Sequence, residues 1–259
     1  FADGAQNPLA LVRLPRERMI GSGVSSSLAH EVGHQGIALL GLLAPARRAL
    51  VARGLGRPWQ RWASEILADF WAVCCLGVSA TVGLLAVVTL PEAFVFRKND
   101  ADVHPTPYLR TLLSAALGAR VFPDPQWQTI ADTWRELYPL RQVSYAAGRE
   151  LALRERQIDA VADVLCELRF PSLDATLPDH LQAASRSPAV LRRLLGAGLK
   201  RATPLRAVAA LGQARADGES PPEAEARLLD QLLRLWALRR SGLTHFSQAP
   251  IEGEKHVIP

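Results

Sequence analysis

Apolar residues recur at helical spacing along most of the chain, whereas the alternation typical of strands is rare. The first long helix is predicted at 25–53, and three serines at its start are suited to cap it. Glycines and a proline at 54–58 end this helix. A second helix begins near Pro58, which a first helical turn tolerates, and runs at least to Cys75. The pattern therefore predicts a mainly α-helical fold.

The rest of the chain continues this pattern. Residues 97–107 are rich in asparagine, aspartate and proline and form a loop, and Pro171 and Pro178 mark a linker. Further helices are expected at 107–119, 126–138, 145–169, 179–186, 188–201, 204–216 and 221–241. Residues 242–259 show no period, and we expect a C-terminal tail there.

An uncharged run at 70–90 would be about 31 Å long as one helix, which is enough to cross a bilayer. Glycine, serine and threonine residues within the run make it only moderately hydrophobic and favour a break. We interpret the run as a buried core helix or as two short ones. The alternative is a membrane span or a re-entrant hairpin.

Composition excludes several classes of protein. Apolar residues make up 49% and charged residues 21%, so the chain is neither disordered nor collagen-like. The basic residues behind the net charge of +5 are almost all arginines, and they do not form a basic stripe interleaved with aromatic residues. We therefore expect no nucleic-acid partner.

Residues 186–240 hold eleven basic residues against five acidic ones. Such an excess is typical of a solvated helix face, and the alternative is contact with an acidic partner or anionic lipid.

The cysteines also bear on location. Cys74, Cys75 and Cys166 do not make a disulfide framework and are typical of a reducing compartment. The first residues lack the charged start and apolar segment of a secretory signal. We expect a cytoplasmic protein, and the alternative is one associated with the inner membrane.

The segment His30-Glu31-Val32-Gly33-His34 carries the clearest chemical signal. Its two histidines lie four residues apart, so a helix projects both imidazoles from one face, where both can bind one tetrahedral zinc ion. Glu31 lies beside the first histidine and can take a proton from a water molecule at the metal. The alternative is that carbonyl groups or water satisfy two histidines on a half-buried helix.

A catalytic zinc site needs a third protein ligand. Glu65 and Asp69 lie four residues apart on the next predicted helix, at the start of the most apolar part of the chain. Carboxylates that face a buried interior need cations or donors nearby. We therefore predict Glu65 as the third ligand and Asp69 as the acceptor for the free N–H of a ligating histidine. The alternative is an ordinary pair on a solvated helix face.

These two motifs, HExxH followed on the next helix by ExxAD, together resemble the gluzincin metallopeptidases. The resemblance implies a zinc centre held by His30, His34 and Glu65. It also implies that Glu31 acts as the general base in hydrolysis of a peptide bond.

A third element is His104-Pro105, with Arg110 five residues beyond the proline. It is similar to the His-Pro…Arg element of the CAAX-prenyl-protease and heat-shock membrane peptidase families. The similarity implies that His104 is a catalytic residue and that Arg110 stabilises an oxyanion or shapes the cleft. Alternatively, Pro105 only sets a turn, and Arg110 pairs with Asp102 or another nearby acid. Two hydroxyl groups are further candidates for the oxyanion, those of Tyr108 and Tyr145.

These motifs predict a zinc-dependent endopeptidase that acts on a protein or peptide substrate. The alternative is a non-proteolytic metal-binding protein that serves as a helical regulator or interaction scaffold. We expect a zinc metallopeptidase core at 1–125, with metal helices at 25–53 and 58–76. A helical C-terminal region at 126–241 would pack on this core, followed by the tail at 242–259.

Overall fold

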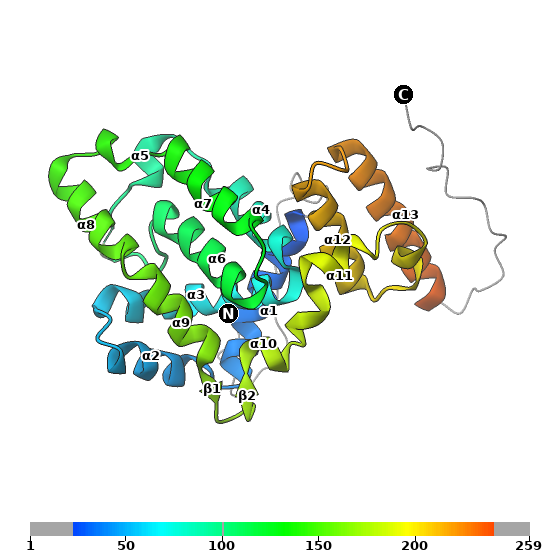
Figure 1. The fold of residues 1–259 in the computed structure, drawn as a ribbon. Helices are drawn as coiled ribbons and strands as arrows, with labels where there is room; N and C mark the ends of the chain where they lie inside the picture. The colour runs from blue at the N-terminus through cyan, green and yellow to red at the C-terminus, as the bar shows by residue number, and fades with distance from the viewer. Residues whose placement is uncertain (1–22, 100, 241–259) are drawn as a thin grey trace.

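The structure is a computed structural model that describes residues 23–99 and 101–240. It is mainly α-helical, which confirms the predicted fold class (Figure 1). The tail predicted at 242–259 lies outside the described residues. The elements in chain order are α1 (Gly23–Leu39), α2 (Leu43–Ala52), α3 (Arg57–Leu76), α4 (Val78–Val88), α5 (Glu92–Val95), α6 (Pro107–Val121), α7 (Gln126–Leu137), α8 (Tyr145–Glu155), α9 (Ile158–Glu167), β1 (Arg169–Phe170), β2 (Ala175–Thr176), α10 (Leu177–His180), α11 (Pro188–Arg192), α12 (Pro204–Ala216) and α13 (Pro222–Arg240).

The single helix expected at 25–53 is wrong, because the chain forms α1 and α2 with an angle of 88° between them. Gly41 ends α1 in the left-handed conformation, with φ of 64°. The N–H of Leu42 then donates to the carbonyl of Ile37 over 3.0 Å, which is the hydrogen bond of a Schellman motif. Glycine has no Cβ atom and therefore adopts this positive φ without strain.

The uncharged run at 70–90 is divided at Gly77, whose φ is 59°. The end of α3 and most of α4 are buried within the helical core. Across the described residues, no single helix has the length and apolar character that a bilayer span requires. The bent pair Ser25–Leu39 and Leu43–Ala52 meets that test only when its two helices are taken together.

The expected helix at 145–169 is also divided, at the step from Arg156 to Gln157. The side chain of Gln157 accepts a hydrogen bond of 2.7 Å from the indole N–H of Trp59, which fixes the start of α9.

The segment around Pro171, expected as a linker, contains an antiparallel hairpin of β1 and β2. Shorter helical segments replace those expected at 179–186 and 188–201, whereas α3, α6, α7, α12 and α13 follow the predicted spans closely.

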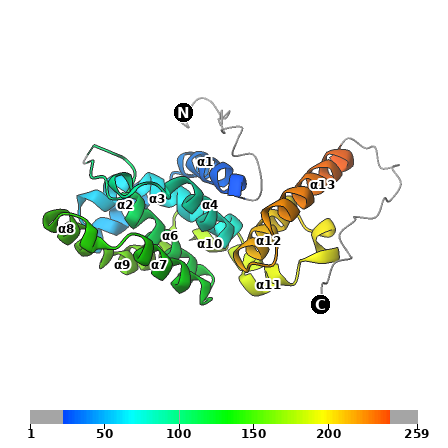
Figure 2. The same ribbon diagram turned by 90° about the horizontal axis from the view of Figure 1, so that it is seen from above.

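Helices α3, α4 and α6 form the centre of the molecule. Helix α1 packs on α3 and α4, and α7 and α9 pack on α6 (Figure 2). Helix α12 contacts α4 and α3, and it joins α11 and α13 at one end of the molecule (Figures 1 and 2). The division into a core at 1–125 and a C-terminal region at 126–241 stays a prediction.

Helices α1 and α3 approach each other closely because glycines of α1 face Trp71. A Cβ atom on Gly36 would lie 2.6 Å from Cη2 of Trp71, and one on Gly33 would lie 3.0 Å from its Cβ. These two glycines therefore let the backbone of α1 settle against α3. The close approach brings the histidine-bearing helix to the helix that carries Glu65 and Asp69.

Candidate metal centre

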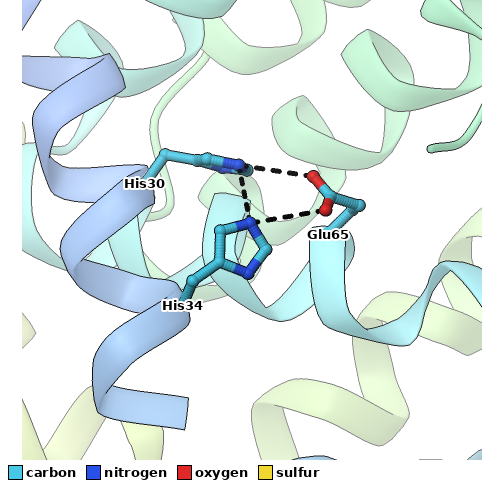
Figure 3. Close-up of side chains that lie close together, drawn as sticks. All are labelled: His30, His34 and Glu65. Atoms are coloured by element: carbon cyan, nitrogen blue, oxygen red, sulfur yellow. Dashed lines mark hydrogen bonds and ion pairs between the residues drawn. The ribbon is translucent and has the colours of Figure 1, made fainter. Parts of the chain in front are cut away.

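Three side chains from two helices converge at one point. His30 and His34 extend from α1 toward Glu65 on α3 (Figure 3). The two imidazoles face the same way because they lie one helical turn apart. The structure therefore brings together the three residues that the sequence predicts as metal ligands.

Their ligand atoms form a compact triangle. Nε2 of His30 lies 3.1 Å from Nε2 of His34 and 3.3 Å from Oε2 of Glu65. Nε2 of His34 lies 3.4 Å from the other oxygen of Glu65, Oε1. Two ligands of a tetrahedral zinc ion, each about 2.0–2.1 Å from the metal, are about 3.3 Å apart. The spacing of the three side chains thus suits a metal ion, and their ligand atoms all lie within 4.8 Å of one another.

One carboxylate oxygen of this triangle lacks a hydrogen bond. Oε2 of Glu65 is buried, and no atom in the described part of the chain donates a hydrogen bond to it with acceptable geometry. The nitrogens of His30 and His104 are only 3.3 and 3.2 Å away. A buried carboxylate oxygen without a donor is costly unless a cation occupies the space before it. A metal ion at the triangle would balance this oxygen, and so would His30 and His104 in their protonated forms.

Asp69 determines how His30 presents its lone pair. Nδ1 of His30 lies 2.8 Å from Oδ1 of Asp69. Because a carboxylate can only accept, Nδ1 carries the proton and Nε2 is left to face Glu65. The structure therefore gives Asp69 the orienting contact that the sequence predicts.

Arg110 holds Asp69 in turn. Its Nε and terminal amine donate to the two carboxylate oxygens over 2.6 and 2.8 Å, a bidentate pair from α6 to α3. Burial raises the pKa of Asp69, but the charge and hydrogen bonds of Arg110, together with His30, lower it to about 2. Asp69 is thus ionised in the folded protein. Arg110 pairs with this acid and not with Asp102.

The two carboxylates also set the charge of the site. Burial lowers the pKa of His30, but its hydrogen bond with Asp69 and its contact with Glu65 raise it to about 9. Burial raises the pKa of Glu65, whereas its contacts with His104, His30 and His34 hold that pKa well below its usual range. Without a metal ion, the two carboxylates thus favour the protonated form of His30, and a bound metal ion would take the place of the proton on Nε2.

Glu31 lies on the exposed side of α1, one residue after His30. No residue that the structure describes forms a hydrogen bond or ion pair with its carboxylate. Burial lowers the pKa of Arg110, and the charge of Glu31 is one of those that raise it above its usual value. The Glu31 carboxylate is therefore near enough for its charge to act on Arg110.

His104 borders the triangle from the loop before α6. Its Nε2 lies 3.2 Å from Oε2 of Glu65, and its Nδ1 lies 2.8 Å from Oδ1 of Asp102. The contact with Glu65 raises the pKa of His104; burial opposes this, and the hydrogen bond with Asp102 adds to the rise. Asp102 also accepts from Arg97 over 3.3 Å. His104 is thus an oriented imidazole that favours its protonated form, with half of its side chain exposed.

The two tyrosines are not part of the cluster. Tyr108 is buried, and its hydroxyl donates to Glu155 over 2.8 Å. Tyr145 is 79% exposed and lies against Arg149.

Sequence reasoning missed one contact of the site. Oγ of Ser64 lies 3.3 Å from Nδ1 of His34. Its position directly before Glu65 on the same helix is the signal that points to it.

Comparison with protein-family models, with curated proteins and with solved structures finds no match for this chain. The similarity to gluzincin metallopeptidases therefore stays a prediction from the motifs. The chemistry of the site rests on its own geometry.

Proposed function

We propose that the protein is a zinc-dependent endopeptidase. The observation that carries this proposal is the convergence of His30, His34 and Glu65, whose ligand atoms all lie within 4.8 Å of one another. Two imidazoles and one carboxylate form a donor set that suits zinc and leaves a coordination position free for reaction. A carboxylate with no partner among the described residues, that of Glu31, lies next to this set.

In this proposal the chain's own residues divide the work. When bound, zinc would lower the pKa of a water molecule to about 7 and polarise the scissile carbonyl group. Glu31 takes the proton of the attacking water and passes it to the leaving amine. His104, held by Asp102, donates a hydrogen bond to the developing oxyanion. Asp69 and Arg110 act as positioning residues, since they hold His30 in one tautomer.

A comparison of variants tests this function. We expect the wild type to cleave a casein-like substrate and Glu31→Gln to lose roughly 100-fold or more of kcat/KM with unchanged zinc content. Glu136→Gln removes an exposed carboxylate of α7 and serves as the matched control. Equal cleavage by the wild type and Glu31→Gln would refute the enzyme. A protein that binds zinc without any cleavage would instead be a metal-binding scaffold.

A further inference from the structure

An open pocket lined by residues of α3, α6 and α8 and of the loop before α6 lies beside the candidate metal centre of His30, His34 and Glu65. His104 lines it and also reaches to 3.2 Å from Glu65, so this residue joins the pocket to the cluster. A peptide held at the cluster would therefore have the pocket within reach of its neighbouring residues.

The pocket has an apolar lining. Phe96 and Leu109 are both buried side chains that contribute to it, together with the half-buried Trp62. An aromatic and aliphatic lining of this kind accommodates the apolar part of a ligand. The burial of Phe96 and Leu109 in the core gives the pocket a fixed shape.

Basic residues outnumber acidic ones in the lining of this pocket. Each acidic side chain is shared by two basic ones: Asp102 contacts both Arg97 and His104, at 3.3 and 2.8 Å. Glu150 contacts Lys98 at 2.8 Å and a second basic residue at 3.9 Å. The charged lining residues are Arg61, Arg97, Lys98 and Arg154 against Asp102 and Glu150. The pocket thus carries more positive than negative charge.

Arg61 is the basic residue best placed to meet a ligand. It is exposed, and no residue in the described part of the chain forms an ion pair or hydrogen bond with it. Arg61 precedes Glu65 by four residues on α3, so both side chains lie on one helix face, with Cβ atoms about 5–6 Å apart. A carboxylate bound to Arg61 would therefore lie about one helical turn from a metal ligand.

We propose that this pocket binds a carboxylate of the peptide substrate through Arg61, with the adjoining apolar part of the peptide against Trp62 and Phe96. The carboxylate belongs either to an acidic side chain near the scissile bond or to the C-terminus of the peptide. The inference rests on the proposed peptidase function for the identity of the ligand. The charge and lining of the pocket support a carboxylate ligand in either case.

Binding to the Glu31→Gln protein tests the pocket without cleavage. The probes are four fluorescent pentapeptides that share a phenylalanine: Glu or Gln follows it, and the C-terminus is free or amidated. We expect the preferred carboxylate peptide to bind roughly tenfold more tightly than its neutral counterpart, because a charge-assisted hydrogen bond contributes to its affinity. Arg61→Ala should abolish this preference and Arg61→Lys should restore part of it. Arg57→Ala, which removes an exposed arginine one turn earlier on α3, should leave the preference unchanged.

The outcomes separate the pocket from the proposed function. A preference for Glu over Gln identifies a side-chain carboxylate, and a preference for the free over the amidated end identifies the C-terminus. Equal binding of all four peptides, or a preference that survives Arg61→Ala, would overturn the pocket proposal. If the wild type cleaves none of them yet Glu31→Gln binds with an Arg61-dependent preference, the pocket stands and the peptidase function fails. If the wild type cleaves the peptides but shows no preference for a carboxylate, the peptidase function stands and the pocket proposal fails.

Discussion

Nδ1 of His30 lies 2.8 Å from Oδ1 of Asp69, a contact that joins α1 to α3 across 39 residues of sequence. The hydrogen bond fixes which imidazole nitrogen carries the proton and turns Nε2 toward Glu65. Arg110 fixes the orientation of the same carboxylate from α6. The orientation of one candidate ligand therefore depends on contacts among three helices.

Replacing Asp69 with asparagine should weaken zinc affinity by roughly 10- to 100-fold, because His30 loses its charged acceptor. The same change leaves the mostly buried Arg110 without its carboxylate, and breaking a buried pair costs about 3–5 kcal/mol of unfolding free energy. Competition with a chromophoric chelator measures the zinc affinity, and urea unfolding measures the stability.

Asp163→Asn is the matched control for this change. Asp163 accepts from Arg120 over 2.9 Å between α9 and α6, but 41% of its side chain is exposed. An exposed pair contributes only about 0–1 kcal/mol, so zinc affinity should not change and stability should fall only slightly. If the two variants behaved alike, Asp69 would have no special role at the site.

The close approach of α1 to α3 predicts a second effect. In Gly36→Ala the new methyl group would lie 2.6 Å from Cη2 of Trp71, so α1 must shift. We expect a loss on the order of 1–3 kcal/mol in unfolding free energy, as for other overpacked interiors, together with weaker zinc binding. Gly198→Ala is the control, since its nearest heavy atom would be 3.6 Å away. An unchanged midpoint for Gly36→Ala in urea unfolding would contradict this packing.

The cysteines should react slowly in the folded protein. Burial raises the pKa of Cys75 to about 11 and that of Cys166 to about 12. The reactive form is the thiolate, and a pKa three units higher leaves about a thousandfold less of it at pH 8. Labelling of Cys166 by iodoacetamide should therefore be far slower in native than in unfolded protein, with a rate that still rises with pH above pH 9. Rapid native labelling that reaches a plateau near pH 9 would show that the thiols are not shielded in this way.

Spacing along the chain predicts much of this fold and of the site. Residues four apart on a helix share a face, so spacing predicts that His30 and His34 face one way and that Glu65 and Asp69 do so on their own helix. The turn at Gly41, which the helix expected at 25–53 lacks, is what allows α1 to pack on α3 and bring the two pairs together. Prolines and glycines locate the starts of α3, α6 and α12 for the same local reason.

The spacing of residues along one helix does not predict which distant segments will contact each other. Arg110 was expected to shape the cleft or to pair with Asp102 or another nearby acid, and the packing of α6 on α3 selects Asp69 as that acid. Arg186 belongs to the basic region that looks like a solvated face. It is buried instead and donates to the carbonyl of Cys74 over 3.0 Å. Such partners depend on how distant helices pack, and reasoning from local residue patterns does not predict that packing.

The zinc centre itself is best tested by metal analysis combined with X-ray absorption at the zinc edge. The account predicts one zinc per chain, bound by nitrogen and oxygen alone with the signature of two imidazoles. Glu65→Ala should lower the occupancy at least tenfold under matched zinc concentration, whereas Glu136→Gln should keep full occupancy. Zinc bound through sulfur, or an occupancy that Glu65→Ala leaves unchanged, would contradict the site described by His30, His34 and Glu65.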